Sequence, residues 1–259
     1  MLSDRKTALS LLKSVLKACK NRPVSAIYTD ELSAQATAEM GHLRRHMANA
    51  SERRRAREYL RGAESRGNLY AERLWAHERA RIAWGRVGLH GKVPESPYRE
   101  FEGAIRLAEL LGDIPGLCKS LSVSSVYCLR FWERHGRREG SWRDEAFEQL
   151  GRSLRLAREH GLHWDEWQAL AGLGFFRVVT QDDWPAGQAI LQNARASWPG
   201  TAPDDRIKLD LMDATLCLLE SRDVEDGTTR AILALEQLLE KWPKKKEVAW
   251  KTECVLLRA

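Results

Sequence analysis

Apolar side chains recur every three or four residues along most of the chain, which is the pattern of helices with one buried face. In residues 4–20, for example, Leu9, Leu12 and Leu16 share a face, and lysines occupy the other side. No stretch alternates apolar and polar residues between turn signals, as a half-buried strand does. The chain is therefore predicted to be all-α. The predicted helices span residues 4–20, 30–48, 52–66, 69–87, 97–112, 115–135, 141–160, 164–181, 184–197, 204–221, 227–241 and 245–258.

A short motif at the predicted helix ends recurs along the chain. The sequence AESRGN at 63–68 matches AELLGD at 108–113, 45 residues later, and IRLAELLG at 105–112 matches LRLAREHG at 154–161, 49 residues later. In each copy an alanine lies about one turn before a glycine, the residue that most easily takes the left-handed conformation that ends helices. Repeats of this length are typical of stacked two-helix hairpins, which together bury apolar faces that one hairpin leaves exposed.

Residues 167–200 resemble the tetratricopeptide repeat, in which two helices form an antiparallel hairpin. Leu173-Gly174 corresponds to the Leu-Gly pair of the family's first helix. Ala186 falls on the small position of the second helix, Ile190 on its bulky position, and Pro199 one residue beyond the terminal proline. The resemblance implies a right-handed α-solenoid.

The predicted architecture is a single elongated stack of about five helical hairpins over residues 29–259. An extra amphipathic basic helix precedes it within residues 1–28. The chain has ten tryptophans, and most are predicted to pack as wedges between the stacked hairpins. An ordinary helical bundle without repeats is the alternative architecture.

By the same resemblance, the first helix of each hairpin lines a concave groove that holds a partner protein or peptide. The Lys and Asn pattern with which the family binds a peptide's terminal carboxylate is absent, which disfavours that kind of partner. The predicted groove residues are Leu74, His77, Arg81, Trp84, Lys119, Ser122, Val126, Gln168 and Phe175.

The charge distribution adds an alternative function. Residues 1–90 hold 18 Lys and Arg against 9 Asp and Glu, a net charge of +9, whereas the whole chain has +6. Arginine binds phosphate well because its guanidinium is always charged and offers paired donors. A nucleic acid or an acidic protein is therefore the alternative partner. The residues predicted to bind it are Arg44, Arg45, Arg53, Arg54, Arg57 and Arg61.

The remaining patterns point away from an enzyme. No phosphate-binding loop, dinucleotide fingerprint or nucleophile elbow occurs, so no cofactor is predicted. Glu39, His42 and His46 share a helical face, but two adjacent arginines disfavour a metal ion there, and none is predicted. Five unpaired cysteines and the lack of a long apolar run indicate a cytoplasmic protein without a membrane span.

The sequence therefore predicts a non-catalytic adaptor or scaffold. The alternatives are a nucleic-acid-associated protein and an accessory or regulatory subunit of a larger complex. The last predicted helix, 245–258, has no second helix to cover it, so self-association through it is a further expectation.

Overall fold

The computed structural model describes residues 2–21, 33, 36–37, 40, 50–64, 68–86, 96–135, 140–180, 183–198, 206–220, 229 and 232–237. Within these residues the regular structure is helical and no strand occurs, which confirms the all-α prediction. The chain divides into two compact units. One unit comprises residues 1–83 and 95–117, and the other comprises residues 84–94 and 118–259. The predicted domain boundary at residues 28 and 29 lies outside the described residues.

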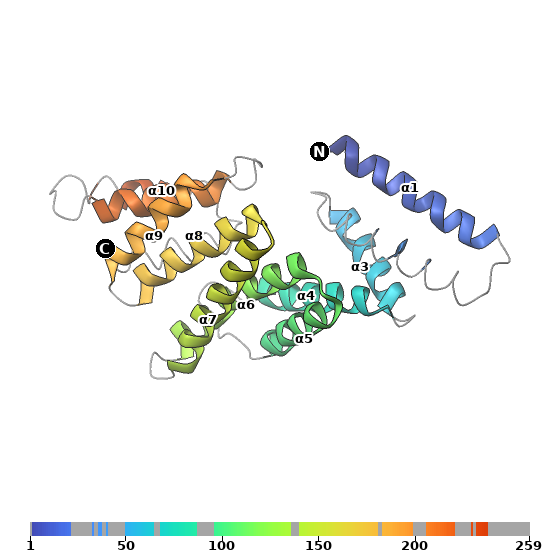
Figure 1. The fold of residues 1–259 in the computed structure, drawn as a ribbon, viewed down its shortest axis with the longest axis horizontal. Coiled ribbons are helices and arrows are strands. Elements are labelled where there is room, and N and C mark those ends of the chain that lie inside the picture. The colour runs from blue at the N-terminus through green and yellow to red at the C-terminus, as the bar shows by residue number, and fades with distance from the viewer. Residues whose placement is uncertain are drawn as a thin grey trace. The chain divides into compact units, whose positions relative to one another are not determined.

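The helices of the first unit are close to the predicted ranges. Those of its helices that the structure describes are α1 (Leu2–Asn21), α3 (Ala50–Glu64), most of α4 (Leu69–Arg86), α5 (Ser96–Leu111) and the first turn of α6 (Ile114–His135). Figure 1 colours these segments from blue to green. Ala56, Leu60 and Ala63 of α3 are buried on the face toward the core, as their i, i+4, i+7 spacing requires.

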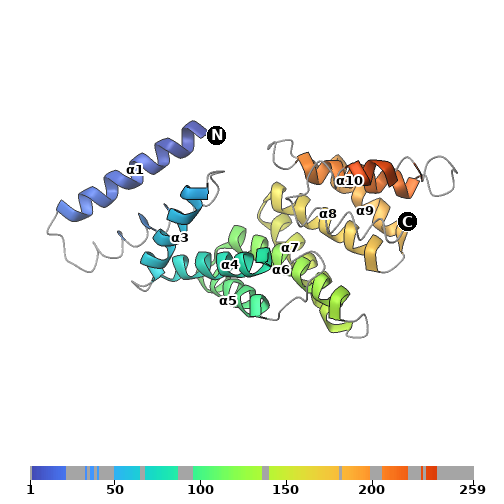
Figure 2. The same ribbon diagram turned by 180° about the vertical axis from the view of Figure 1, so that it is seen from behind.

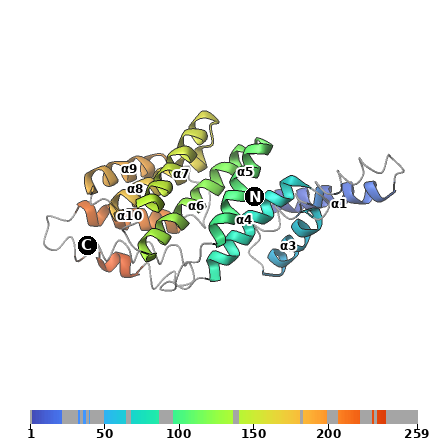
Figure 3. The same ribbon diagram turned by 90° about the horizontal axis from the view of Figure 1, so that it is seen from below.

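The second unit contains the rest of α6, then α7 (Gly140–Glu159), α8 (His163–Thr180), α9 (Trp184–Ala196) and α10 (Arg206–Glu220). These helices pack on their neighbours in chain order: α7 against α8, α8 against α9, and α9 against α10. Hydrogen bonds between Cys118 and Ser153 join α6 to α7 in the same way. Figure 2 shows these helices from behind, and Figure 3 shows them from below.

The repeated sequence motif forms the same structure at each site described. Gly112 and Gly161 have φ angles of 62° and 64°, so each ends its helix in the left-handed conformation. The residue after the glycine donates its backbone N–H to the carbonyl of the alanine five residues earlier, and that alanine is fully buried. These bonds run from Asp113 to Ala108 (2.9 Å), from Leu162 to Ala157 (2.8 Å) and from Asn68 to Ala63 (3.2 Å).

Two of these helix ends also start the next helix. The Asn68 side chain accepts a hydrogen bond from the backbone N–H of Ala71 at 2.8 Å. Asp113, 45 residues later, accepts one from Gly116 at 3.0 Å. Each side chain satisfies one of the backbone donors that a helix start leaves unpaired. The sequence repeat is therefore a repeated stop-and-start signal between consecutive helices.

Glycines bring α8 and α9 close together. A Cβ atom at Gly187 would lie 2.6 Å from Cγ2 of Val178 and 3.2 Å from the carbonyl oxygen of Gly174. Gly174 in turn has no room for a Cβ beside Leu191. Gly172 lies close to α7 in a similar way, because a Cβ there would lie 3.1 Å from Cδ1 of Leu150. The partner of Gly174 on α9 is Gly187, one residue after the position that the family resemblance implies.

Substituting Gly187 by alanine is expected to lower the free energy of unfolding by about 1–2 kcal/mol. Overpacking a tight contact costs about 1–3 kcal/mol. The higher helix propensity of alanine offsets up to about 1 kcal/mol of this cost. Gly151→Ala is the matched control, because a Cβ there meets nothing within 4 Å. It should stabilise the protein by about 0.5–1 kcal/mol. Urea denaturation of both variants measures the difference, and equal effects would contradict the close contact.

Candidate functional site

The predicted groove residues of the second unit fall on α6 and α8. Lys119, Ser122 and Val126 lie three and four residues apart on α6 and are half-buried, as is Gln168 on α8. Phe175, also on α8, is only 4% exposed and belongs to the core. The accessible part of this prediction is therefore the set of four half-buried residues on α6 and α8, which together with half-buried Asp165 we call the α6/α8 surface.

The predicted groove residues of the first unit are less accessible. Leu74 and His77 of α4 are 0% and 1% exposed, and the His77 ring packs edge-on against Phe101 with the ring centroids 5.9 Å apart. Residues 71 and 73–77 of α4 are all buried, so Leu74 and His77 belong to the core of this unit. Arg81 and Trp84 lie on α4, but their side chains are outside the described part of the chain.

A charged pair marks the α6/α8 surface. Asp165 is half-buried in the first turn of α8, and Lys119 of α6 is close enough to stabilise its negative charge. Burial raises the pKa of the Asp165 carboxyl above its ordinary value, and the charge of Lys119 opposes that rise without cancelling it. Ionised Asp165 therefore costs folding free energy at neutral pH, a feature that is enriched at functional sites.

The sequence identified only part of this pair. The helix predicted over residues 164–181 has Asp165 and Glu166 near its start, and both lie in the first turn of α8. The proximity of Asp165 to Lys119 was missed, because the two residues come from helices that are not adjacent in the chain. Periodicity within one helix carries no signal for such a contact.

Substituting Asp165 by asparagine is expected to stabilise the protein at pH 7 by a few tenths of a kcal/mol, the scale of half-exposed charges. The pKa of Asp165 is higher in the folded than in the unfolded protein. The cost of its charge to folding is therefore absent below the unfolded-state pKa, grows between the two pKa values, and is fully present above the folded-state pKa. The gain should therefore disappear near pH 3. Melting temperatures of the variant and the wild type between pH 3 and 7 measure it.

The control for this experiment is Glu166→Gln in the same turn. Glu166 accepts a hydrogen bond from Arg158 Nε at 2.9 Å, so its neutral variant should lose a little stability at pH 7. A stability gain from Asp165→Asn that is equal at pH 3 and pH 7 would show that burial of the charge is not its cause.

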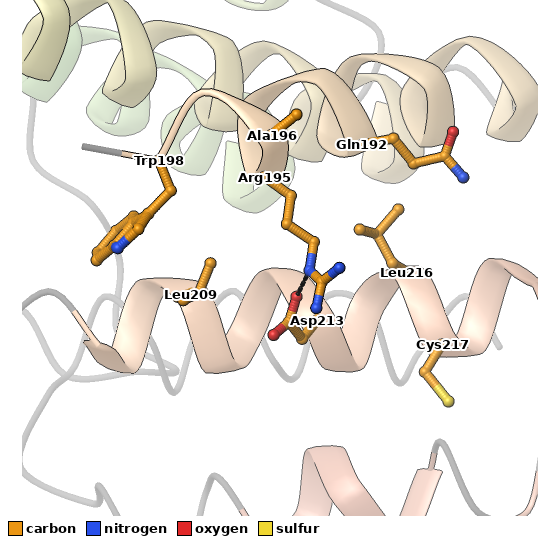
Figure 4. A pocket seen from close by; sticks show the side chains of 8 residues that line it. All are labelled: Gln192, Arg195, Ala196, Trp198, Leu209, Asp213, Leu216 and Cys217. Carbon is orange, nitrogen blue, oxygen red and sulfur yellow. Dashed lines mark hydrogen bonds and ion pairs between the residues drawn. The ribbon is translucent and has the colours of Figure 1, made fainter. Parts of the chain in front are cut away.

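A pocket between α9 and α10 is a second candidate site, which the sequence did not predict. It has a volume of about 600 Å³. Figure 4 shows Arg195 of α9 reaching toward α10, where its Nε donates a hydrogen bond to Asp213 Oδ1 at 2.5 Å. The described residues that line the pocket are Gln192, Arg195, Ala196, Trp198, Leu209, Asp213, Leu216 and Cys217.

Three tryptophans hold one wall of this pocket in place. The indole of Trp198 packs edge-on against that of Trp167, with ring centroids 4.6 Å apart, and against Trp164 at 5.9 Å. Trp167 is fully buried, whereas Trp164 and Trp198 are half-buried. Trp198 therefore presents an apolar surface at the pocket, and its ring contacts with Trp164 and Trp167 hold it in position.

The arginines of α3 form an exposed positive surface. Arg54, Arg57 and Arg61 are all exposed, on the side of the helix away from buried Ala56 and Leu60. The guanidinium of Arg61 lies 4.7 Å above the centre of the Trp75 ring. Arg53 lies on α3 with its side chain outside the description, and Arg44 and Arg45 lie outside the described residues, as do Glu39, His42, His46 and residues 245–258.

Comparisons with known proteins add no family. No family model matches the chain, and no curated protein matches it significantly. Among the described residues, no three His, Cys, Asp or Glu side chains gather as metal ligands. No described helix is both long enough and apolar enough to cross a membrane.

Proposed function

We propose that the protein is a non-catalytic adaptor with a helical-repeat architecture, which binds a segment of a partner protein along the α6/α8 surface. The observation that carries this proposal is the half-buried carboxyl group of Asp165 on α8, whose negative charge is stabilised by Lys119 of α6. The two residues belong to helices that are separated in the chain by α7, and both are half-buried.

The physical argument is one of electrostatic cost. A folded protein retains a partly desolvated carboxylate at the expense of stability, and groups with such shifted pKa values are enriched at functional sites. A partner that donates hydrogen bonds to Asp165 would lower that cost on binding. Chain-order packing of α6 to α10 supports a stack of hairpins, the architecture in which such surfaces are continuous.

The test compares matched charge reversals in affinity capture from the native host. Lys119→Glu should lose a specific protein that the wild type retains, whereas Arg155→Glu, an exposed position on α7, should retain it. Circular dichroism verifies that both variants are folded. A partner that both variants retain would refute the α6/α8 surface as its binding site.

A second candidate function is nucleic-acid binding through α3. The specific observation is that Arg54, Arg57 and Arg61 are exposed together while the opposite face of the helix is buried. If these arginines neutralise phosphates, the affinity for nucleic acid should fall steeply as the salt concentration rises. The reason is that binding releases counterions from the nucleic acid, and this release is less favourable at high salt. Polarisation of labelled single-stranded RNA and duplex DNA, measured over a KCl series, tests this.

The control for α3 is a variant that loses the same number of arginines from another helix. Substituting Arg54, Arg57 and Arg61 by glutamine should reduce the slope of log affinity against log salt by about 3 for duplex DNA. The same substitutions at Arg143, Arg152 and Arg155 of α7 should leave the slope unchanged. Equal slopes for both triple variants would exclude α3 as the binding surface.

A further inference from the structure

The geometry points to the α9/α10 pocket as a binding site for a peptide segment that places a bulky apolar side chain beside an acidic one. The pocket uses other helices than the α6/α8 surface. Its assignment therefore goes beyond the proposed function, and each can fail without the other.

The apolar half of the pocket is suited to the bulky apolar side chain of the bound peptide. Trp198 offers one half-exposed face of its indole, and Leu209 and Leu216 of α10 complete the apolar lining. Because Trp198 is held against Trp164 and Trp167, its ring is positioned before any ligand arrives. A rigid aromatic wall in a concave site is typical of the residues that dominate binding energy. The volume of about 600 Å³ lies within the range of ligand pockets.

The polar half of the pocket is suited to the acidic side chain of the bound peptide. Arg195 uses Nε for Asp213, and the terminal nitrogens of its guanidinium extend into the space between the two helices (Figure 4). A guanidinium has five N–H donors and binds a carboxylate through two of them at once. The side chains of Arg195 and Asp213 are 60% and 41% exposed, so a ligand can reach them.

Asp213 has two opposing effects on the binding of an acidic ligand. Its carboxylate orients Arg195, but its negative charge also repels an incoming acid. Removing that charge should strengthen binding, while removing the charge of Arg195 should weaken it. A purely structural role for the ion pair predicts that both changes act in the same direction.

The experiment selects peptides from a random dodecapeptide library displayed on phage, using the full chain as target. Enriched peptides should combine a large apolar residue with Asp or Glu, and they should not bind Ala196→Phe, which fills the pocket from an exposed position. The affinity of a synthetic enriched peptide should fall about tenfold for Arg195→Gln and rise severalfold for Asp213→Asn.

Arg158→Gln is the matched control, because Arg158 is 53% exposed, also pairs with one carboxylate, and does not line the pocket. Its affinity for the peptide should equal that of the wild type. The assignment is overturned if no peptide is enriched over Ala196→Phe, if the enriched peptides lack an acidic residue, or if Asp213→Asn weakens binding as Arg195→Gln does. Loss of the peptide with Lys119→Glu would place it on the α6/α8 surface instead.

Discussion

Replacing Asp113 by asparagine is expected to lower the free energy of unfolding by about 3 kcal/mol. Asp113 pairs with Arg73, whose side chain is only 3% exposed. Removing one partner of a buried ion pair leaves the other charge buried and uncompensated, which costs about 3–5 kcal/mol. Asparagine keeps a side-chain oxygen for the hydrogen bond from Gly116, so the start of α6 is preserved. The loss of stability therefore measures the effect of removing the negative charge that pairs with Arg73. Urea denaturation measures it.

Two further variants make this result specific. Asp144→Asn removes a carboxylate that is 67% exposed and pairs with the adjacent Arg143, so it should cost less than about 1 kcal/mol. Combining Asp113→Asn with Arg73→Met removes both charges and should recover most of the lost stability. If the double variant were as unstable as the single one, the buried charge of Arg73 could not be the cause.

Replacing Trp167 by alanine is expected to cost about 3–5 kcal/mol, which is the range for deleting a large buried aromatic side chain. Trp167 is fully buried in the core of the second unit, between the indoles of Trp164 and Trp198. The cavity would remove support from both neighbours. Thermal and urea unfolding measure the loss, and near-ultraviolet circular dichroism reports the change in tryptophan packing.

The phenylalanine variant separates packing from hydrogen bonding. Trp167 Nε1 is buried and has no hydrogen-bond acceptor among the described residues, so Trp167→Phe removes area but no hydrogen bond. It should cost about 1–2 kcal/mol, well below the alanine variant. Leu110→Ala, at a side chain that is 70% exposed, should change stability by less than about 0.5 kcal/mol. Similar losses for the alanine and phenylalanine variants would contradict the packing role.

Local signals in the sequence predicted the helices well. The period of apolar residues, together with helix-ending glycines such as Gly112 and Gly161, placed the described helix ends within one or two residues. Both signals act within a few residues of the chain, because a helix closes its hydrogen bonds over four residues and a glycine ends it through its own φ angle. The repeat of 45 and 49 residues was visible for the same reason.

Contacts between separate helices were not predictable in this way. The ion pair of Arg73 with Asp113 and the proximity of Lys119 to Asp165 each join residues 40 or more positions apart. Leu74 and His77 were assigned to a groove by the family resemblance, yet both are buried, because an equivalent position in a repeat does not say what covers it. The α9/α10 pocket depends on the distance between two helices, for which one sequence holds no direct signal.

The chain-order packing of α6 to α10 also bears on how fast this part of the protein folds. From α7 to α10 each helix packs on the next one along the chain, so only short loops must close before apolar area is buried. Folds of low contact order reach the native state in microseconds to milliseconds. The helix ends at Gly112 and Gly161 form from residues five apart, so they can end one helix before distant contacts exist.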